Sequence, residues 1–119
     1  MKFYHGTKTV NVPSILKNGL KPDTTYGYSC IARDYEGAEA YAEWFHPDED
    51  VTVLEITLDE KTAPLWPDMH RLVDEEADMI EDGKIQKGDL ENATWRDSLR
   101  WIGQCVYQGT IPPSAMRSA

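Results

Sequence analysis

The chain has 119 residues, of which 40% are hydrophobic and 28% charged, and its formal net charge is −9. This length and composition are typical of one globular domain with a single core, and the negative charge disfavours non-specific binding to nucleic acids. No apolar run is long enough to span a bilayer, and the first residues lack the apolar region of a signal peptide. Because two cysteines make no disulfide framework, we expect a cytoplasmic protein without a membrane partner.

The first third of the chain predicts a strand, a helix and a second strand. Residues 2–4 read as a short strand that Gly6 ends. Asn11 can cap a helix, and Gly19 follows where a left-handed C-terminal cap is expected. The stretch YSCIA at 28–32 is rich in apolar residues and predicts a buried strand.

The middle of the chain predicts two helices around a strand. Asp34 can cap a helix that ends before the acidic loop HPDED. The stretch VTVLEITLD at 51–59 is rich in β-branched residues and is the clearest strand. A helix follows over 69–80, and the apolar side chains available for its core face are Leu72, Val73 and Ile80.

The last third predicts one more helix and a closing strand. The helix begins near Asn92 or Thr94 and runs through Trp101. The stretch QCVYQGTI at 104–111 reads as the last strand, and residues 114–119 are expected to form a loose tail. Strands and helices alternate irregularly, so the prediction is an α+β fold over 1–119 with a largely antiparallel sheet.

Two kinds of chemistry fit the sequence poorly. The three histidines His5, His46 and His70 lie far apart, and neither cysteine belongs to a CxxC pair, so no metal site is expected. A nucleophilic pair of His5 with Cys30 or Cys105 stays an alternative, although buried cysteines in strands are usually inert.

Three stretches, in this order, resemble the ADP-ribosyltransferase superfamily. They are YHGTKTVNVPSILKNGLKP, YSCIARDYEGAEAYAEWF and QCVYQGTIPPSAM, and together they cover nearly half the chain. The superfamily includes poly-ADP-ribose polymerases, DarT-type DNA-modifying toxins and RNA 2′-phosphotransferases. The resemblance implies a split sheet around a cleft that binds NAD.

The resemblance also implies roles for particular residues. His5 would hydrogen-bond the adenosine ribose, and the backbone at Gly6 would hold the nicotinamide amide, since a residue without a side chain lets backbone approach a flat ring. Thr7 and Ser29 would contribute to the cofactor site. Tyr41 would stack on the nicotinamide.

Two positions depart from the pattern of the superfamily's His-Tyr-Glu branch. That branch has a tyrosine in its second strand. Tyr28 lies close to the matching position, but the spacing from Tyr41 places that position nearer Cys30. The glutamate that opens the last strand is replaced by Gln104, which can accept a hydrogen bond but brings no charge. Either the activity is then low, or the reaction needs no charged partner, or another acid supplies the charge, and Glu55 is a possible substitute.

The function that the resemblance implies is transfer of ADP-ribose from NAD to a macromolecule, with a protein acceptor favoured over a nucleic acid. The small size fits a toxin or phage effector. One alternative is RNA 2′-phosphotransferase chemistry, which needs more basic residues than this chain offers. Others are an NAD- or ADP-ribose-binding module that has lost catalysis, and an acidic protein that occupies a basic site on a partner.

Several of these side chains also have purely structural interpretations. His5 could be a structural histidine, and Tyr41 could belong to the core as readily as to a pocket. Trp95 and Trp101 are expected to pack in the interior, and the role of Ser98 stays open.

Overall fold

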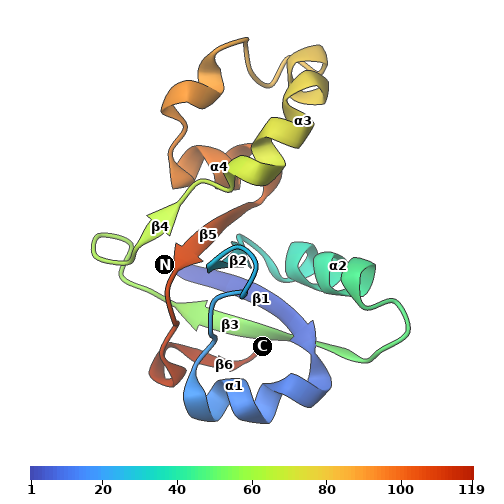
Figure 1. Cartoon of the computed structure of the whole chain (residues 1–119), viewed down its shortest axis with the longest axis vertical. Helices are drawn as coiled ribbons and strands as arrows, with labels where there is room; N and C mark the ends of the chain where they lie inside the picture. Colours follow the sequence, from blue (N-terminus) through green and yellow to red (C-terminus); the bar gives the residue numbers. More distant parts are fainter.

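The computed structural model describes residues 1–119 as an α+β fold with one six-stranded antiparallel sheet (Figure 1). The sheet has the order β4-β5-β2-β1-β3-β6. The strands are β1 (Lys2–Lys8), β2 (Tyr28–Ala32), β3 (Val51–Thr57), β4 (Leu65–Trp66), β5 (Gln104–Gln108) and β6 (Met116–Ser118). The helices are α1 (Val12–Asn18), α2 (Tyr35–Phe45), α3 (Met69–Glu81) and α4 (Trp95–Ile102).

The sheet is nearly divided between β1 and β2. Seven residue pairs join β1 to β3, and five join β2 to β5. In contrast, β1 and β2 are joined by the single pair Tyr4 and Ala32. The two halves β4-β5-β2 and β1-β3-β6 therefore meet at one point and diverge beyond it, which is the split sheet that the resemblance implies.

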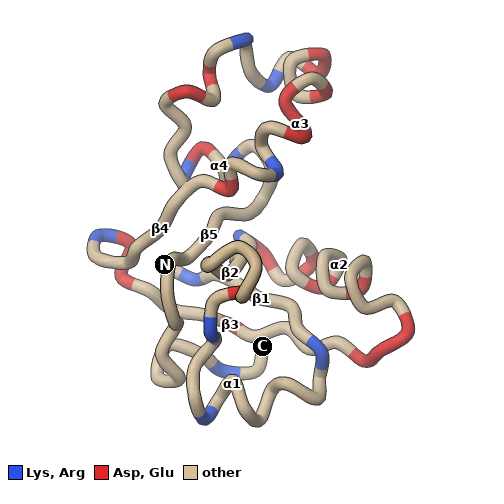
Figure 2. The backbone as a smooth tube through the Cα atoms, viewed as in Figure 1, with Lys and Arg blue, Asp and Glu red and all other residues tan.

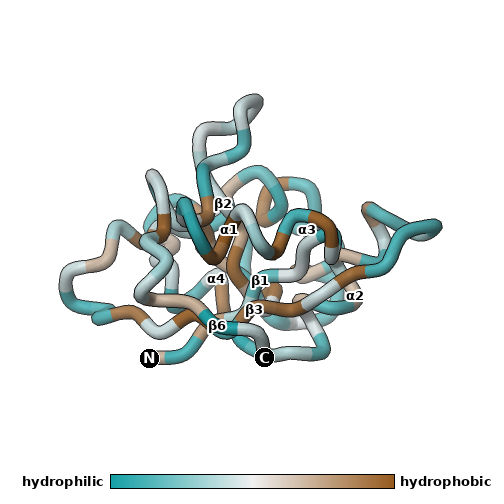
Figure 3. The backbone as a smooth tube through the Cα atoms, turned by 90° about the horizontal axis from the view of Figure 1, so that it is seen from below, coloured by the Kyte–Doolittle hydropathy of each residue, from teal (hydrophilic) through white to brown (hydrophobic).

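The two faces of the sheet are covered differently. The main core of twelve buried residues includes Phe3, Ile15 and Ile111, so α1 and the C-terminal segment cover this face. Helix α2 covers β1 on the opposite face, where Ala38 and Val53 form a small apolar cluster. In the hydropathy view the most apolar backbone runs through the strands and the helix faces turned toward them (Figure 3).

Helices α3 and α4 form a helical layer beyond the β4-β5 end of the sheet (Figure 1). This layer has its own cluster of buried side chains, Leu72, Met79, Ile85 and Leu90. Acidic residues gather on α3 and in the loop after α2 (Figure 2). None of the helices is long and apolar enough to cross a membrane.

Two helix starts and one helix end follow the local signals in the sequence, whereas the Asn11 side chain forms no capping hydrogen bond at the start of α1. The Asp34 carboxylate accepts a hydrogen bond from the Gly37 backbone and caps α2, as predicted. Thr94 and Asp97 form a reciprocal capping box at the start of α4. Gly19 ends α1 with φ of 93°, a conformation that favours glycine.

The C-terminus is not the loose tail that was predicted. Residues 113–115 form a 3-10 turn, and β6 pairs with β3 as an edge strand. Met116 is buried in the main core, and Arg117 forms an ion pair with Glu55. Because apolar burial and a strand ladder both hold this segment, it belongs to the folded domain, and β5 is not the last strand.

Three other local predictions were wrong. Strand β1 continues through Gly6 to Lys8, because β3 pairs with its whole length. The short strand β4 was not predicted. On α3, Val73 is 60% exposed and Ile80 is 39% exposed, whereas Met79 is buried with Leu72.

Candidate functional site

A cleft of about 990 Å³ opens where β1 and β2 diverge. Residues from β1, β2, α2, α3 and the start of β5 line it. All seven side chains or backbone positions that the sequence predicted for the site belong to this lining: His5, Gly6, Thr7, Tyr28, Ser29, Tyr41 and Gln104. The fold thus brings together residues that are up to 99 positions apart.

The opposing edges of β1 and β2 are open along the cleft. If the antiparallel register of Tyr4 and Ala32 continued, Gly6 would face Cys30 and Thr7 would face Ser29, but these residues are not paired. Strand edges carry backbone N–H and C=O groups that need partners. The cleft therefore presents peptide groups suited to a ligand with an amide or hydroxyl.

His5 bridges the two strands where the ladder stops. Its Nδ1 donates a hydrogen bond of 2.7 Å to the Cys30 carbonyl. Burial lowers the pKa of His5, and the hydrogen bond to Cys30 offsets only part of that effect. The ring is therefore neutral at pH 7 with its proton on Nδ1, which leaves Nε2 as a hydrogen-bond acceptor.

Gly6 is required by packing against α2. An added Cβ would lie 2.3 Å from the Ala38 carbonyl oxygen and 2.6 Å from the Ala42 Cβ. These distances are far below van der Waals contact, and neither atom belongs to a flexible side chain. The close approach of β1 to α2 explains this glycine without a ligand, and the contact with a nicotinamide amide stays a prediction.

Thr7 and Ser29 are buried residues at the wall of the cleft. The Ser29 hydroxyl donates a hydrogen bond of 3.3 Å to the Lys21 carbonyl, which fastens the loop after α1 to β2. Ser29 thus has a structural partner already. Thr7 lies on the β1 side of the opening, at the position that a ligand between the strands would reach.

Aromatic side chains stand on two sides of the cleft. Tyr41 and Phe45, one turn apart on α2, have ring centroids 4.7 Å apart, and Phe45 is 57% exposed. Tyr28, the first residue of β2, stacks with Tyr26, and their ring centroids are 5.8 Å apart. Burial is the main cause that raises the pKa of Tyr41, so its phenol stays protonated and can donate a hydrogen bond.

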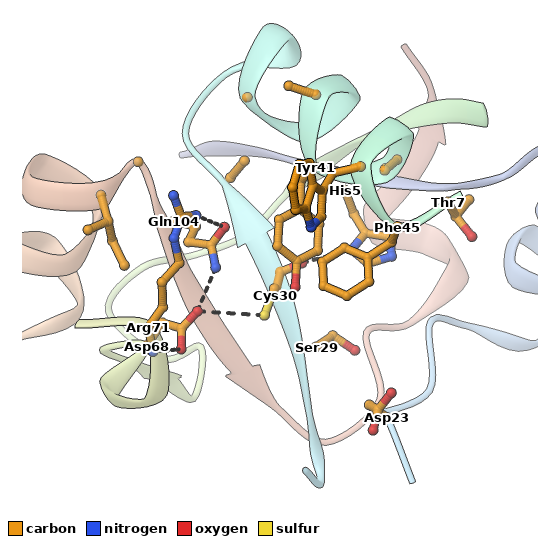
Figure 4. A pocket seen from close by; sticks show the side chains of 18 of the residues that line it. His5, Thr7, Asp23, Ser29, Cys30, Tyr41, Phe45, Asp68, Arg71 and Gln104 are labelled. Carbon is orange, nitrogen blue, oxygen red and sulfur yellow. Dashed lines mark hydrogen bonds between the residues drawn. The ribbon is translucent and has the colours of Figure 1, made fainter. Parts of the chain in front are cut away.

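Gln104 is held by two hydrogen bonds at one side of the cleft (Figure 4). Its Nε2 donates to Asp68 Oδ2 at 2.5 Å, and its Oε1 accepts from the Arg71 guanidinium at 2.7 Å. This amide orientation is fixed chemically, because the reverse would place two donors together at Arg71 and two acceptors together at Asp68. Both the oxygen and the nitrogen of the Gln104 side-chain amide are thus hydrogen-bonded to other residues of the protein.

Asp68 and Arg71 are the site residues that the sequence analysis missed. Asp68 caps α3 by accepting a hydrogen bond from the Arg71 backbone, and it is only 3% exposed. The Ser98 hydroxyl accepts from the Asp68 backbone N–H at 3.1 Å and donates to the Gln104 carbonyl at 2.5 Å. An aspartate before a helix reads as an ordinary cap, so only its pairing with Gln104, 36 residues away, reveals it.

Glu55 does not take the place of the missing glutamate. It lies on β3 outside the cleft, where it forms ion pairs with Lys2 at 2.9 Å and Arg117 at 3.1 Å. The acid next to Gln104 is Asp68. Cys30 occupies the central position on β2 that the tyrosine spacing indicates, with its thiol 3.8 Å from Asp68 Oδ2.

The cysteine nucleophile is disfavoured by its surroundings. Burial and then the charge of Asp68 raise the pKa of Cys30 to about 12, so the reactive thiolate is scarce at neutral pH. Burial likewise raises the pKa of Cys105 to about 12. The Cys30 thiol contacts Asp68 Oδ2, and no hydrogen bond joins it to a ring nitrogen of His5, so the two do not form a His–Cys pair of the kind that activates a thiol.

Trp95, Trp101 and most of the N-terminal lysines lie outside the cleft. Trp95 packs against the main core, and Trp101 packs against the helical layer, as expected. Lys2 and Lys8 form ion pairs with carboxylates of β3 and the preceding loop. Lys21 lines the cleft and forms no ion pair.

No family model matches the chain, and a search of the curated proteins finds no match to it.

Proposed function

We propose that the cleft binds NAD and that the protein transfers ADP-ribose from NAD to a macromolecular acceptor, with a protein acceptor favoured. The observation that carries this proposal is the divergence of β1 and β2, with His5, Gly6 and Thr7 on one side and Tyr28 to Cys30 on the other. The resemblance of the sequence to the ADP-ribosyltransferase superfamily rests on the same residues.

The groups around the opening suit the parts of this ligand. The acceptor Nε2 of neutral His5 suits a ribose hydroxyl. Open peptide edges suit the carboxamide of nicotinamide, and Tyr41 with Phe45 offers aromatic faces for a flat ring. Lys21 is the lining cation without a carboxylate partner, so it suits the pyrophosphate.

The proposed reaction exchanges one bond for another at ribose C1′. The bond to the nicotinamide nitrogen breaks, and its electron pair leaves with neutral nicotinamide. A lone pair of the acceptor forms the new bond, and the acceptor's proton passes to solvent. Positive charge develops on the ribose meanwhile, so the protein's contribution is to position the reactants and stabilise that charge.

Charge on the cleft disfavours an RNA 2′-phosphotransferase. A phosphorylated RNA junction would require several free cations. The lining contains Lys21 and two arginines, both of which are engaged by acceptors, against the four aspartates Asp23, Asp34, Asp68 and Asp74.

A binding module is the second candidate, and the state of Gln104 favours it. Both ends of the Gln104 amide are bonded to Asp68 and Arg71, so this side chain offers no free group to a reacting ribose. A protein that kept the cleft and lost turnover would have this arrangement.

The binding half of the proposal is tested by thermal unfolding with NAD and ADP-ribose at millimolar concentration. A ligand at 100 times its Kd stabilises the native state by ~2.7 kcal/mol, which raises Tm. His5→Ala should weaken the shift, and so should Lys21→Ala. Lys17→Ala is the charge-matched control, because Lys17 is an exposed residue of α1 outside the cleft. No Tm shift with either ligand would refute the proposal.

Release of nicotinamide separates the two candidates. The wild-type protein is incubated with NAD alone and with cell extract that supplies acceptors. Turnover that requires extract supports a transferase. NAD binding without nicotinamide release under either condition leaves the binding module.

A further inference from the structure

The chain's most enclosed cleft carboxylate is Asp68, which lies between β4 and α3 beside Gln104. Its Oδ2 accepts a hydrogen bond from Gln104 Nε2 and is 3.8 Å from the Cys30 thiol. Its Oδ1 accepts from the Arg71 backbone at 3.3 Å. Figure 4 shows Asp68 at one end of the labelled group, with Cys30 between it and Tyr41.

The surroundings of Gln104 keep a net negative charge although glutamine is neutral. Arg71 contacts Gln104 through one guanidinium nitrogen and Glu75 through Nε. Asp68 and Glu75 together carry two negative charges against the one positive charge of Arg71. The group around Gln104 therefore has the net charge that a glutamate at 104 would bring; Asp68 is its cleft-lining carboxylate, and Glu75 pairs with Arg71 outside the lining.

The negative charge of Asp68 affects the pKa values of other side chains in the cleft. Burial is the first cause that raises the pKa of Tyr28, Cys30 and Tyr41, and the charge of Asp68 adds to the increase at each of them. The charge of Asp68 thus raises the pKa of side chains on both strand β2 and helix α2.

We propose that Asp68 supplies the negative charge of this site in place of a glutamate at 104, that Gln104 positions the Asp68 carboxylate, and that the cleft therefore selects the oxidised, cationic form of a pyridine nucleotide over its neutral reduced form. This inference rests on the proposed function. The inference also changes the expected effect of Gln104→Glu. The introduced carboxylate would lie beside that of Asp68, and two adjacent carboxylates share one proton, so the substitution does not simply add a charge.

The experiment compares the affinities of the oxidised and reduced nucleotides by isothermal titration calorimetry. The quantity measured is the ratio of the Kd for NADH to the Kd for NAD, which exceeds one in the wild-type protein. Asp68→Asn removes the charge and keeps a side chain that caps helices equally well. It should lower the ratio by about tenfold, since an opposite charge within ~4–6 Å shifts a charge equilibrium by ~1–3 log units.

Two further variants distinguish charge from structure. Asp78→Asn is the matched control, because Asp78 is an exposed carboxylate of α3 outside the cleft lining; its ratio should stay at the wild-type value. In the double variant D68N/Q104E the new asparagine donates to the new glutamate and Arg71 pairs with it. The charge moves by one hydrogen bond, and the ratio should return toward the wild-type value.

Each outcome supports or overturns a different statement. Binding of both nucleotides with a ratio at or below one in the wild-type protein overturns the inference and leaves the proposed function. If Asp68→Asn leaves the ratio of the two Kd values unchanged, the inference is also overturned and the proposed function stays. Should that variant unfold, Asp68→Ser keeps a capping hydroxyl without the carboxylate and gives the same comparison. Absence of any nucleotide binding by the wild-type protein overturns the proposed function, and the inference with it.

Discussion

Replacing Gly6 with alanine should separate α2 from the sheet. The new Cβ would meet the Ala38 carbonyl oxygen at 2.3 Å and the Ala42 Cβ at 2.6 Å. Both atoms belong to the helix framework, so the whole of α2 has to move. Overpacking typically costs ~1–3 kcal/mol, and two rigid contacts place this site at the upper end. Alanine regains ~0.5–1 kcal/mol of chain entropy relative to glycine in a strand, which leaves a net loss of ~2 kcal/mol.

The assay is thermal and urea unfolding followed by circular dichroism. In a chain of this size ~1 kcal/mol moves Tm by ~4 °C, so Gly6→Ala should lower Tm by ~8 °C. Gly83→Ala is a comparison variant without a packing contact, since Gly83 has no atom within 4 Å of an added Cβ; unlike Gly6 it has a positive φ, of 77°. That variant measures backbone strain alone, at ~1 kcal/mol.

A second substitution tests whether the helix contact is the cause. Ala42→Gly in the Gly6→Ala background removes the contact at 2.6 Å but leaves the closer contact with the Ala38 carbonyl. It should cost less stability there than the ~1 kcal/mol that Ala42→Gly costs in the wild-type helix, because it also relieves this contact. Gly6→Ala with wild-type stability would refute the packing argument. A loss of NAD binding at wild-type stability would instead assign Gly6 to the ligand.

Three further results are expected. Cys30 and Cys105 should resist alkylation at pH 8 in the native protein and react after unfolding in urea, because burial raises the pKa of each thiol to about 12; rapid modification of the folded protein would contradict this. Because burial lowers the pKa of His5 below its unfolded value of 6.5, the unfolded state binds more protons as pH falls, so stability should be full above about pH 6.5 and decline below it. Unfolding at pH 7.5 and 5.5 should show a smaller decline for His5→Asn than for the wild-type protein. Deletion of residues 114–119 should cost ~2 kcal/mol or more, since it removes an edge strand and a buried methionine; an unchanged Tm would mean that the segment contributes nothing.

Elements with local signals in the amino-acid sequence could be predicted without the structure. Asp34 and Thr94 begin helices because their side chains satisfy nearby backbone N–H groups. Gly19 ends α1 because it adopts a positive φ. The β-branched run at 51–57 forms a strand, and these features together were enough to predict the α+β class.

Local patterns could not decide which stripe of α3 is buried. Leu72 and Met79 are seven residues apart, and so are Val73 and Ile80, so both pairs follow the helical period. The packing of α3 against α4 buries the first pair and exposes the second. Similarly, β6 is a strand because β3 offers it an edge, which no property of residues 116–118 alone would indicate.

The residues of the candidate site could likewise be predicted only in part from the sequence. His5, Tyr41 and Gln104 could be named from the order of the three stretches in the sequence, and the cleft contains all of them. Asp68 could not be named, because its carboxylate meets Gln104 only when α3 folds over the start of β5. A hydrogen bond between residues 36 positions apart depends on the positions of whole elements, and those positions are determined by the packing of the core.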